Sequence, residues 1–361
     1  MPEGGGKTYT TLERRVNPRV ARQAAIHLEQ LPVDIAETAR RLADETLFPA
    51  ALATDAADVV PVELLDALAD AGLYGLTGPA ASGGLGADFP TACAVVEALA
   101  SGCLTTTFVW VQHIGVVLAA TASQNDEVAA LVPSLCRGER RAGLALGGAV
   151  PGPPLLRARQ TGDGWTFTGT SPFVSGWRRI DLIHTAARSD DGRLVWALID
   201  ASESETLTIH RLDLAALNAT ATVRTDLREH PVPDERVTSV SPYTEGSPPP
   251  ELLRIHAALP LGVAARCCAL LGPTPLDEEL LRLRAELDRL DPASMQVSRG
   301  ASGELAMRAA AALAVATGSR SLVRTEHAQR LVREALFGLV YALRPGSRQA
   351  LLERLGAAPP A

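Results

Sequence analysis

The chain has 361 residues, of which 47% are hydrophobic and 21% charged, which is enough apolar material for two or three globular domains. Its formal net charge of -7 argues against a nucleic-acid-binding protein, which needs a basic face. No uninterrupted apolar run reaches the roughly 18 residues of a membrane span. Residues 1–11 are polar and lack the apolar core of a signal peptide. We expect a cytoplasmic protein that binds neither nucleic acid nor membranes.

Missing residue types exclude several kinds of active site. Lys7 is the only lysine, which removes a P-loop lysine and argues against a Schiff-base lysine. The seven histidines show no zinc-motif spacing, and no GxSxG nucleophile motif is present. The five cysteines form no CxxC pair, so we expect buried free thiols. No metal centre is predicted.

The first part of the chain reads as helical. Residues 1–30 are polar and mixed, and we interpret them as an N-terminal arm. Apolar residues recur at helical spacing over 33–47, and Pro49 is predicted to end that helix. Further helices are expected over 62–71, 90–101, 105–122 and 126–136, with a glycine-rich loop at 79–86. Residues 31–140 are therefore predicted to form an N-terminal helical domain.

The pattern then changes to strands and back to helices. Residues 165–168 alternate apolar and polar side chains, and two short apolar runs flank the turn Ser189-Asp190-Asp191-Gly192. Residues 141–245 are predicted to form a middle β-domain. Helical spacing returns over 252–271, 276–290, 301–318 and 327–342, so 246–361 is predicted to be a C-terminal helical domain.

This order of helices, strands and helices, together with several short sequence motifs, resembles the acyl-CoA dehydrogenase flavoprotein family over about residues 33–355. The stretches that carry the resemblance are GLYGL at 72–76 followed by GGLG at 83–86, GTSPFVSG at 169–176, and QRLVREA at 329–335. The resemblance implies a mixed α and β fold with an N-terminal helical domain, a middle β-barrel-like domain and a C-terminal helical bundle. It also implies FAD, bound between the β-domain and the C-terminal helices.

The resemblance assigns cofactor contacts residue by residue. Phe173 takes the place of the aromatic that packs on the flavin ring, and Ser175 the place of the hydroxyl that reaches flavin N5. The alternative is that Phe173 is a core side chain and Ser175 a turn residue. The backbone of Leu146 and Gly147 is predicted to contact the flavin ring, and Gly318 is the surviving glycine of a Gln-x-x-Gly-Gly motif that contacts FAD. Arg344 is predicted to contact the phosphates, with Arg320 or Arg324 as alternatives.

The usual catalytic glutamate is absent from both places where the family carries it. Tyr341 is followed by Ala342, and the second place is occupied by Leu252. Neither side chain accepts a proton. Glu251 is the neighbour of Leu252 and stays a candidate base, although one helical step is a turn of about 100°. The predicted diphosphate loop at 146–154 also contains three prolines, which donate no amide hydrogen bond.

Three further residues are candidates for chemistry. His113 and His256 lie on helices that line the substrate side of the flavin in this family, and each is a candidate catalytic group. Arg254 is a candidate for holding an acidic group of the substrate. The alternatives are packed histidines and an ion-paired arginine.

Three functions follow from the resemblance. The first is an FAD-dependent oxidoreductase acting on an acyl thioester, and the second is a reduced-flavin monooxygenase of the same fold. The third is a catalytically silent partner subunit or binding module. An acyl thioester or another small molecule is the expected ligand, with an electron-transfer or reductase protein as partner. Assembly into a homodimer or homotetramer, or with a homologous chain, is expected through the C-terminal helices, where residues 309–316 are rich in alanine.

Overall fold

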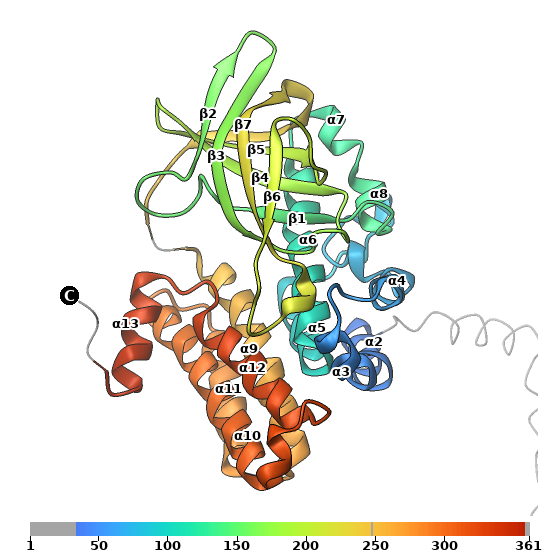
Figure 1. The fold of residues 1–361 in the computed structure, drawn as a ribbon, viewed down its shortest axis with the longest axis vertical. Coiled ribbons are helices and arrows are strands. Elements are labelled where there is room, and N and C mark those ends of the chain that lie inside the picture. The colour runs from blue at the N-terminus through green and yellow to red at the C-terminus, as the bar shows by residue number, and fades with distance from the viewer. Residues whose placement is uncertain (1–33, 247, 358–361) are drawn as a thin grey trace, which may run out of the picture.

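The computed structural model describes residues 34–246 and 248–357 (Figure 1). The predicted arm at 1–30 lies outside the described residues. Helices come first along the chain, an eight-stranded sheet follows, and helices return at the end. The predicted mixed fold class is therefore confirmed. The domain boundaries after residues 140 and 245 stay predictions. In the structure, α8 ends at Cys136 before β1 begins at Ala142, and β8 ends at Pro242 before α9 begins at Pro250.

The first helical group surrounds two long apolar helices. Its elements are α2 (Ile35–Leu42), the π turn η1 (Ala43–Leu47), α3 (Phe48–Ala56), α4 (Val62–Asp70), η2 (Leu73–Gly75), η3 (Ala80–Ser82), α5 (Phe89–Gly102), α6 (Leu104–Ala122), α7 (Asp126–Ala129) and α8 (Val132–Cys136). The prediction that Pro49 ends a helix is wrong. The π turn shifts the hydrogen-bond pattern, and the helical path continues through Pro49 to Ala56.

The middle group is one sheet with the strand order β6-β7-β3-β2-β4-β5-β8, and β1 pairs separately with β4. The strands are β1 (Ala142–Ala145), β2 (Leu156–Thr161), β3 (Gly164–Val174), β4 (Leu182–Ser189), β5 (Arg193–Asp200), β6 (Leu207–Arg211), β7 (Val223–Pro233) and β8 (Val237–Pro242). Pairing is antiparallel except where β4 meets β1 and β2. The register of β3 against β7 shifts between Ser171 and Val174, which marks a bulge.

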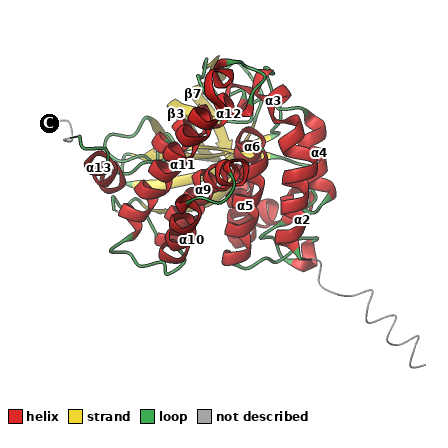
Figure 2. Ribbon diagram, turned by 90° about the horizontal axis from the view of Figure 1, so that it is seen from below, coloured by secondary structure: helices red, strands yellow, loops and turns green. Residues whose placement is uncertain are grey.

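The second helical group packs against the first. It contains α9 (Pro250–Leu271), α10 (Pro275–Leu287), α11 (Met295–Thr317), η6 (Gly318–Leu322), α12 (His327–Val340) and α13 (Pro345–Arg354). Seen from below, the two groups of helices stand side by side with the strands behind them (Figure 2).

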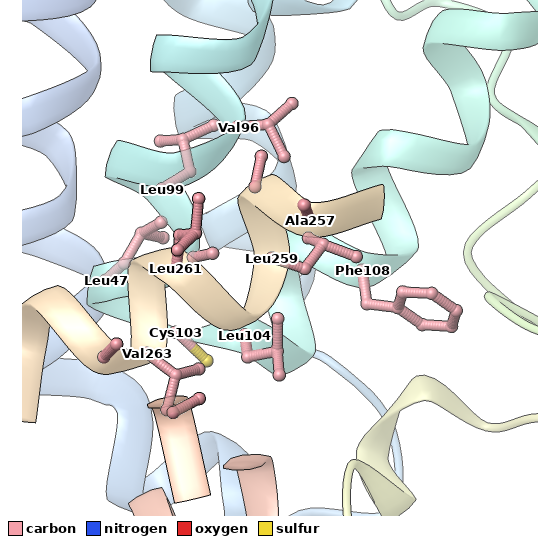
Figure 3. Packing of buried hydrophobic residues seen from close by; sticks show 14 of the residues in the cluster. Leu47, Val96, Leu99, Cys103, Leu104, Phe108, Ala257, Leu259, Leu261 and Val263 are labelled. Atoms are coloured by element: carbon pink, nitrogen blue, oxygen red, sulfur yellow. The ribbon is translucent and has the colours of Figure 1, made fainter. Parts of the chain in front are cut away.

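One hydrophobic core joins the two helical groups. Leu47, Val96 and Leu99 of the first group meet Leu261 and Val263 of α9 (Figure 3). Helix α9 crosses α5 so closely that a Cβ at Gly262 would overlap the Glu97 carbonyl oxygen. The two groups therefore share one interior, which fixes α9 relative to α5 and α6.

Two helices, α6 and α9, are long and apolar enough to cross a membrane by length and composition alone. In each, 67% of the most apolar window is buried inside the fold, as in the core helices of a globular protein. All five cysteines are buried and free. Among the residues described, no three His, Cys, Asp or Glu side chains gather where they would hold a metal ion.

Candidate functional site

Phe173 stands at the outer end of β3, in the bulge against β7. Its φ of +57° lies in the left-handed region, which is unusual for an aromatic residue, and its side chain is 67% exposed. The alternative of a core phenylalanine is therefore wrong. An exposed ring on a strained backbone position is typical of a ligand or partner contact.

Ser175 lies two residues further on and is buried in a chain of hydroxyl groups. Thr220 donates its only hydroxyl proton to the Leu217 carbonyl at 2.8 Å, so it must accept from Thr222 at 2.7 Å. Thr222 must then accept from Ser175, also at 2.7 Å. Ser175 therefore donates its hydroxyl proton to Thr222, and toward a ligand this hydroxyl can only accept a hydrogen bond. It does not supply the donor to flavin N5 expected from the resemblance.

Most amides of the loop after β1 donate hydrogen bonds within the chain. The Gly147 N–H donates to Ser171 Oγ at 3.0 Å, and the Gly148 N–H to the Ala186 carbonyl at 2.8 Å. The Gly152 N–H donates to Glu245 Oε1 at 3.2 Å. The Leu146 side chain is 41% exposed. Of the two backbone groups that the resemblance assigns to FAD, the Gly147 N–H thus donates to the protein itself.

Arg188 of β4 holds the carbonyl side of the same loop. Its guanidinium donates to the carbonyls of Gly148 at 2.9 Å, Val150 at 2.7 Å and Gly152 at 2.9 Å. The same group lies 3.4 Å from the centre of the Tyr243 ring, a cation–π contact. The loop therefore wraps its carbonyls around a cation and does not present amides to an anion.

These contacts test whether FAD fits this chain. The ring end is compatible, because Phe173 offers an exposed aromatic face at the end of β3. The diphosphate end is not, because it needs several free amide donors, whereas most amides of the loop donate within the chain or are replaced by proline, and the carboxylate of Glu245 lies beside them. The chain by itself does not fit the whole cofactor.

No residue at the two expected base positions accepts a proton. Ala342 has a φ of +51°, and Leu252 is 36% exposed in the first turns of α9. Glu251 precedes Leu252 and is exposed in the first turn of α9.

His256 lies one turn further along α9, edge-on to the Tyr341 ring with centroids 5.3 Å apart. Burial and the positive charges of Arg299 and Arg344 lower the pKa of His256 to about 3. The imidazole is neutral at physiological pH, and it is a weak base because its conjugate acid loses the proton readily. This lowered pKa does not favour His256 as the base that removes a substrate proton.

His113 of α6 has a structural position. The Ala142 N–H donates to its Nδ1 at 3.1 Å, so Nε2 carries the proton and donates to the Leu135 carbonyl at 3.0 Å. Burial lowers the pKa of His113 to about 4. Both ring nitrogens are occupied by backbone groups, which leaves none for a substrate and argues against the expected catalytic role.

Arg254 is buried and paired with a carboxylate. Its Nε donates to Asp288 Oδ1 at 2.6 Å, while Nη1 has no partner. Arg254 is thus the ion-paired arginine that was the alternative to a role in holding the substrate. A similar bond joins Arg284 to the buried Glu97 on α5. The two pairs attach the segment from α10 to Asp288 to the shared helical core.

The remaining predicted contacts lie at the ends of the last helices. Gly318 ends α11 with a φ of +71° and has open space around it. Arg344 is half-buried before α13 and forms no salt bridge within the described ranges, 34–246 and 248–357. Arg320 pairs with Glu326 instead of pointing to an open phosphate site.

Sequence reasoning missed Arg188 and Arg299. Each is an isolated arginine in an ordinary strand or helix, so no motif marks it. Tyr243 and Glu245, at the end of the predicted β-domain, were not predicted as contacts of the loop after β1, which both of them touch.

Comparison with known proteins identifies relatives of the chain. Residues 33–139 match the family described as "Acyl-CoA dehydrogenase, N-terminal domain". A 168-residue segment is 29% identical to 3-sulfinopropanoyl-CoA desulfinase of Paraburkholderia xenovorans (strain LB400) and covers 44% of this chain. That segment spans only 42% of the relative's own length.

Two solved structures show the same fold over most of the chain. One is a glutaryl-coenzyme A dehydrogenase in complex with glutaryl-CoA, at a TM-score of 0.73 and 17% identity, covering 89% of this chain and 94% of that one. The other is a methanesulfinate monooxygenase from Pseudomonas fluorescens, at a TM-score of 0.70 and 19% identity, covering 90% of this chain and 98% of that one. At these identities the likeness concerns the fold.

Proposed function

We propose that this chain, which belongs to the acyl-CoA dehydrogenase superfamily by its N-terminal domain and its fold, is the acyl-thioester-binding subunit of a flavin-dependent oxidoreductase. By itself it neither holds FAD nor removes the substrate proton. A second chain of the same fold supplies the diphosphate contacts and the base. The proposal places the chain in the cytoplasm, in keeping with its free thiols.

The observation that carries the proposal is that the loop after β1 is already hydrogen-bonded within the chain. Its amides donate to Ser171, Ala186 and Glu245, and its carbonyls receive Arg188. A bound diphosphate would have to displace these bonds and lie beside a carboxylate, which costs more than binding to open amides. Substitution of both base positions by apolar residues supports the same conclusion.

An acyl thioester is supported as ligand by the named relatives. The Paraburkholderia desulfinase is named for 3-sulfinopropanoyl-CoA. The resemblance implies that α6 and α9 line the substrate site, and the shared core fixes the positions of these two helices. An electron-transfer or reductase protein then acts on the complete assembly.

A self-contained FAD oxidoreductase is the second candidate. It is favoured by Phe173, whose exposed ring and strained backbone are what a flavin-stacking residue would show. In that case the diphosphate is held by groups other than the loop after β1, such as Arg344.

Titration of the purified chain with butyryl-CoA, by calorimetry and by visible absorption with FAD added, tests the proposal. We expect the thioester to bind without FAD and not to bleach added flavin in the absence of oxygen. Bleaching by the isolated chain would favour the second candidate. No binding of the thioester in either condition would refute both.

A further inference from the structure

The short segment that follows β8 passes beside the loop after β1 (Figure 1). We call this segment, residues 243–246, the cover. The Tyr243 hydroxyl donates to the Val150 carbonyl at 3.4 Å. Glu245 Oε1 accepts from the Gly152 N–H at 3.2 Å. Two side chains of the cover therefore close on the loop.

The covered part of the loop surrounds a cation. Arg188 donates four hydrogen bonds to loop carbonyls, which leaves one of the five N–H groups of its guanidinium. The Tyr243 ring lies on this guanidinium, with 3.4 Å between its carbon and the ring centre. In the part of the chain that the structure describes, no carboxylate forms a salt bridge with Arg188. A positive charge without an acidic partner thus lies directly beneath the cover.

Gly152 connects this cation to the cover. Its carbonyl accepts from Arg188 Nη1 at 2.9 Å, while its N–H donates to Glu245. Its φ is +80°, and an added Cβ would meet no atom within 4 Å, so there is room beside it for a ligand atom. A backbone amide next to a guanidinium is a pair of donors suited to an anionic oxygen. Glu245 occupies the amide of this pair from within the chain.

The Glu245 contact is local and weak, yet it excludes other anions. Glu245 is exposed, so water screens its charge, and one amide bond holds its carboxylate. Because the chain tethers the carboxylate next to the amide, it competes with a free anion at a high effective concentration. Its negative charge also repels a diphosphate that approaches Arg188. Such a contact keeps an anion out and still opens at a small cost.

We propose that the cover is autoinhibitory. Glu245 and Tyr243 close an anion site that consists of the Gly152 amide and Arg188, and a diphosphate binds there only when the cover is displaced. The inference rests on the proposed function and deepens it, because it names the contact that keeps the FAD diphosphate off the isolated chain. The three prolines of the loop are permanent, whereas the carboxylate can move away.

Replacement of Glu245 by alanine removes the carboxylate and leaves the loop sequence intact. Glu235→Ala is the matched control, because the Glu235 side chain is exposed on η5 and makes no hydrogen bond or salt bridge in the described structure. Binding of inorganic pyrophosphate to each intact chain is measured by calorimetry at one ionic strength. Retention of FAD through gel filtration and hydrogen exchange at the Gly152 amide are measured on the same proteins. The double variant Glu245→Ala/Arg188→Met shows whether the anion binds at the loop.

We expect Glu245→Ala to bind pyrophosphate about tenfold more tightly than wild type and Glu235→Ala do, the scale of one charge-assisted contact. Exchange at Gly152 should accelerate in Glu245→Ala and not in Glu235→Ala, and the double variant should lose the gain in affinity. Equal affinity of wild type and Glu245→Ala, or an equal gain in Glu235→Ala, would overturn the inference and leave the proposed function standing. Retention of about one FAD per chain by wild type would refute both, whereas retention by Glu245→Ala alone would support both.

Discussion

Replacement of Arg188 by methionine removes the cation that organises the loop after β1. Methionine has a similar length and apolar stem but donates no hydrogen bond. The change leaves the carbonyls of Gly148, Val150 and Gly152 without their common donor and ends the contact with Tyr243.

The size of the effect follows from these contacts. A hydrogen bond from a charged donor contributes about 1.5–3 kcal/mol when buried, and a cation–π contact about 0.5–1 kcal/mol at an exposed site. The loop is partly open to water, which will satisfy some of the released carbonyls. We therefore expect a loss of about 3 kcal/mol in all, which lowers Tm by about 6–12 °C in a domain of 150–250 residues.

Thermal melts followed by tryptophan fluorescence measure this loss, and Arg157→Met is the control. Arg157 lies on β2 and makes an exposed salt bridge with Asp190, so its replacement should change Tm by at most about 1 °C. Hydrogen exchange at the amides of Gly147 and Gly148 should accelerate only in Arg188→Met. A Tm and exchange rates equal to wild type in Arg188→Met would refute the view that this arginine holds the loop.

Two further predictions concern the fold. Gly262→Ala should destabilise the chain by about 1–3 kcal/mol in urea unfolding, because the new Cβ would overlap the Glu97 carbonyl where α9 crosses α5. The control Gly115→Ala, in open space on α6, should stabilise the chain by about 0.5–1 kcal/mol. Equal effects of the two substitutions would contradict the close crossing of α9 and α5. The free energy of unfolding should fall as the pH drops from about 6.5 to about 4, because burial lowers the pKa of His113 and His184 to about 4. In that range the two histidines are protonated in the unfolded chain but not in the folded one. His113→Asn should flatten the dependence of Tm on pH over this window, and an unchanged slope would refute the assignment.

The order of the three groups was predictable because the periodicity of apolar residues changes twice along the chain. Helical spacing gives way to alternation near residue 142 and returns near residue 250, and the helices and strands follow it. Pro49 was misread because proline usually ends a helix. A π turn is a tertiary feature, and no residue type announces it.

The family resemblance points to β3, the loop after β1 and the start of α9 as the candidate site, and that placement stays a prediction. The chemistry of these residues was not predictable from the sequence. The roles depend on partners far along the chain, and sequence patterns do not show them. Arg188 meets Gly148 across 40 residues, and Arg299 meets Tyr341 across 42. Ser175 looked like a free donor because the Thr222–Thr220 chain that takes its proton was not visible in the sequence.

Flavin content of the purified chain tests the central claim most directly. The chain is mixed with excess FAD, passed through gel filtration, and its visible absorption compared with its protein absorption. The account predicts a colourless protein with well under one FAD per chain, because most amides of the loop after β1 already donate hydrogen bonds within the chain. A yellow protein that retains about one FAD per chain would contradict it and make this chain a complete flavoprotein.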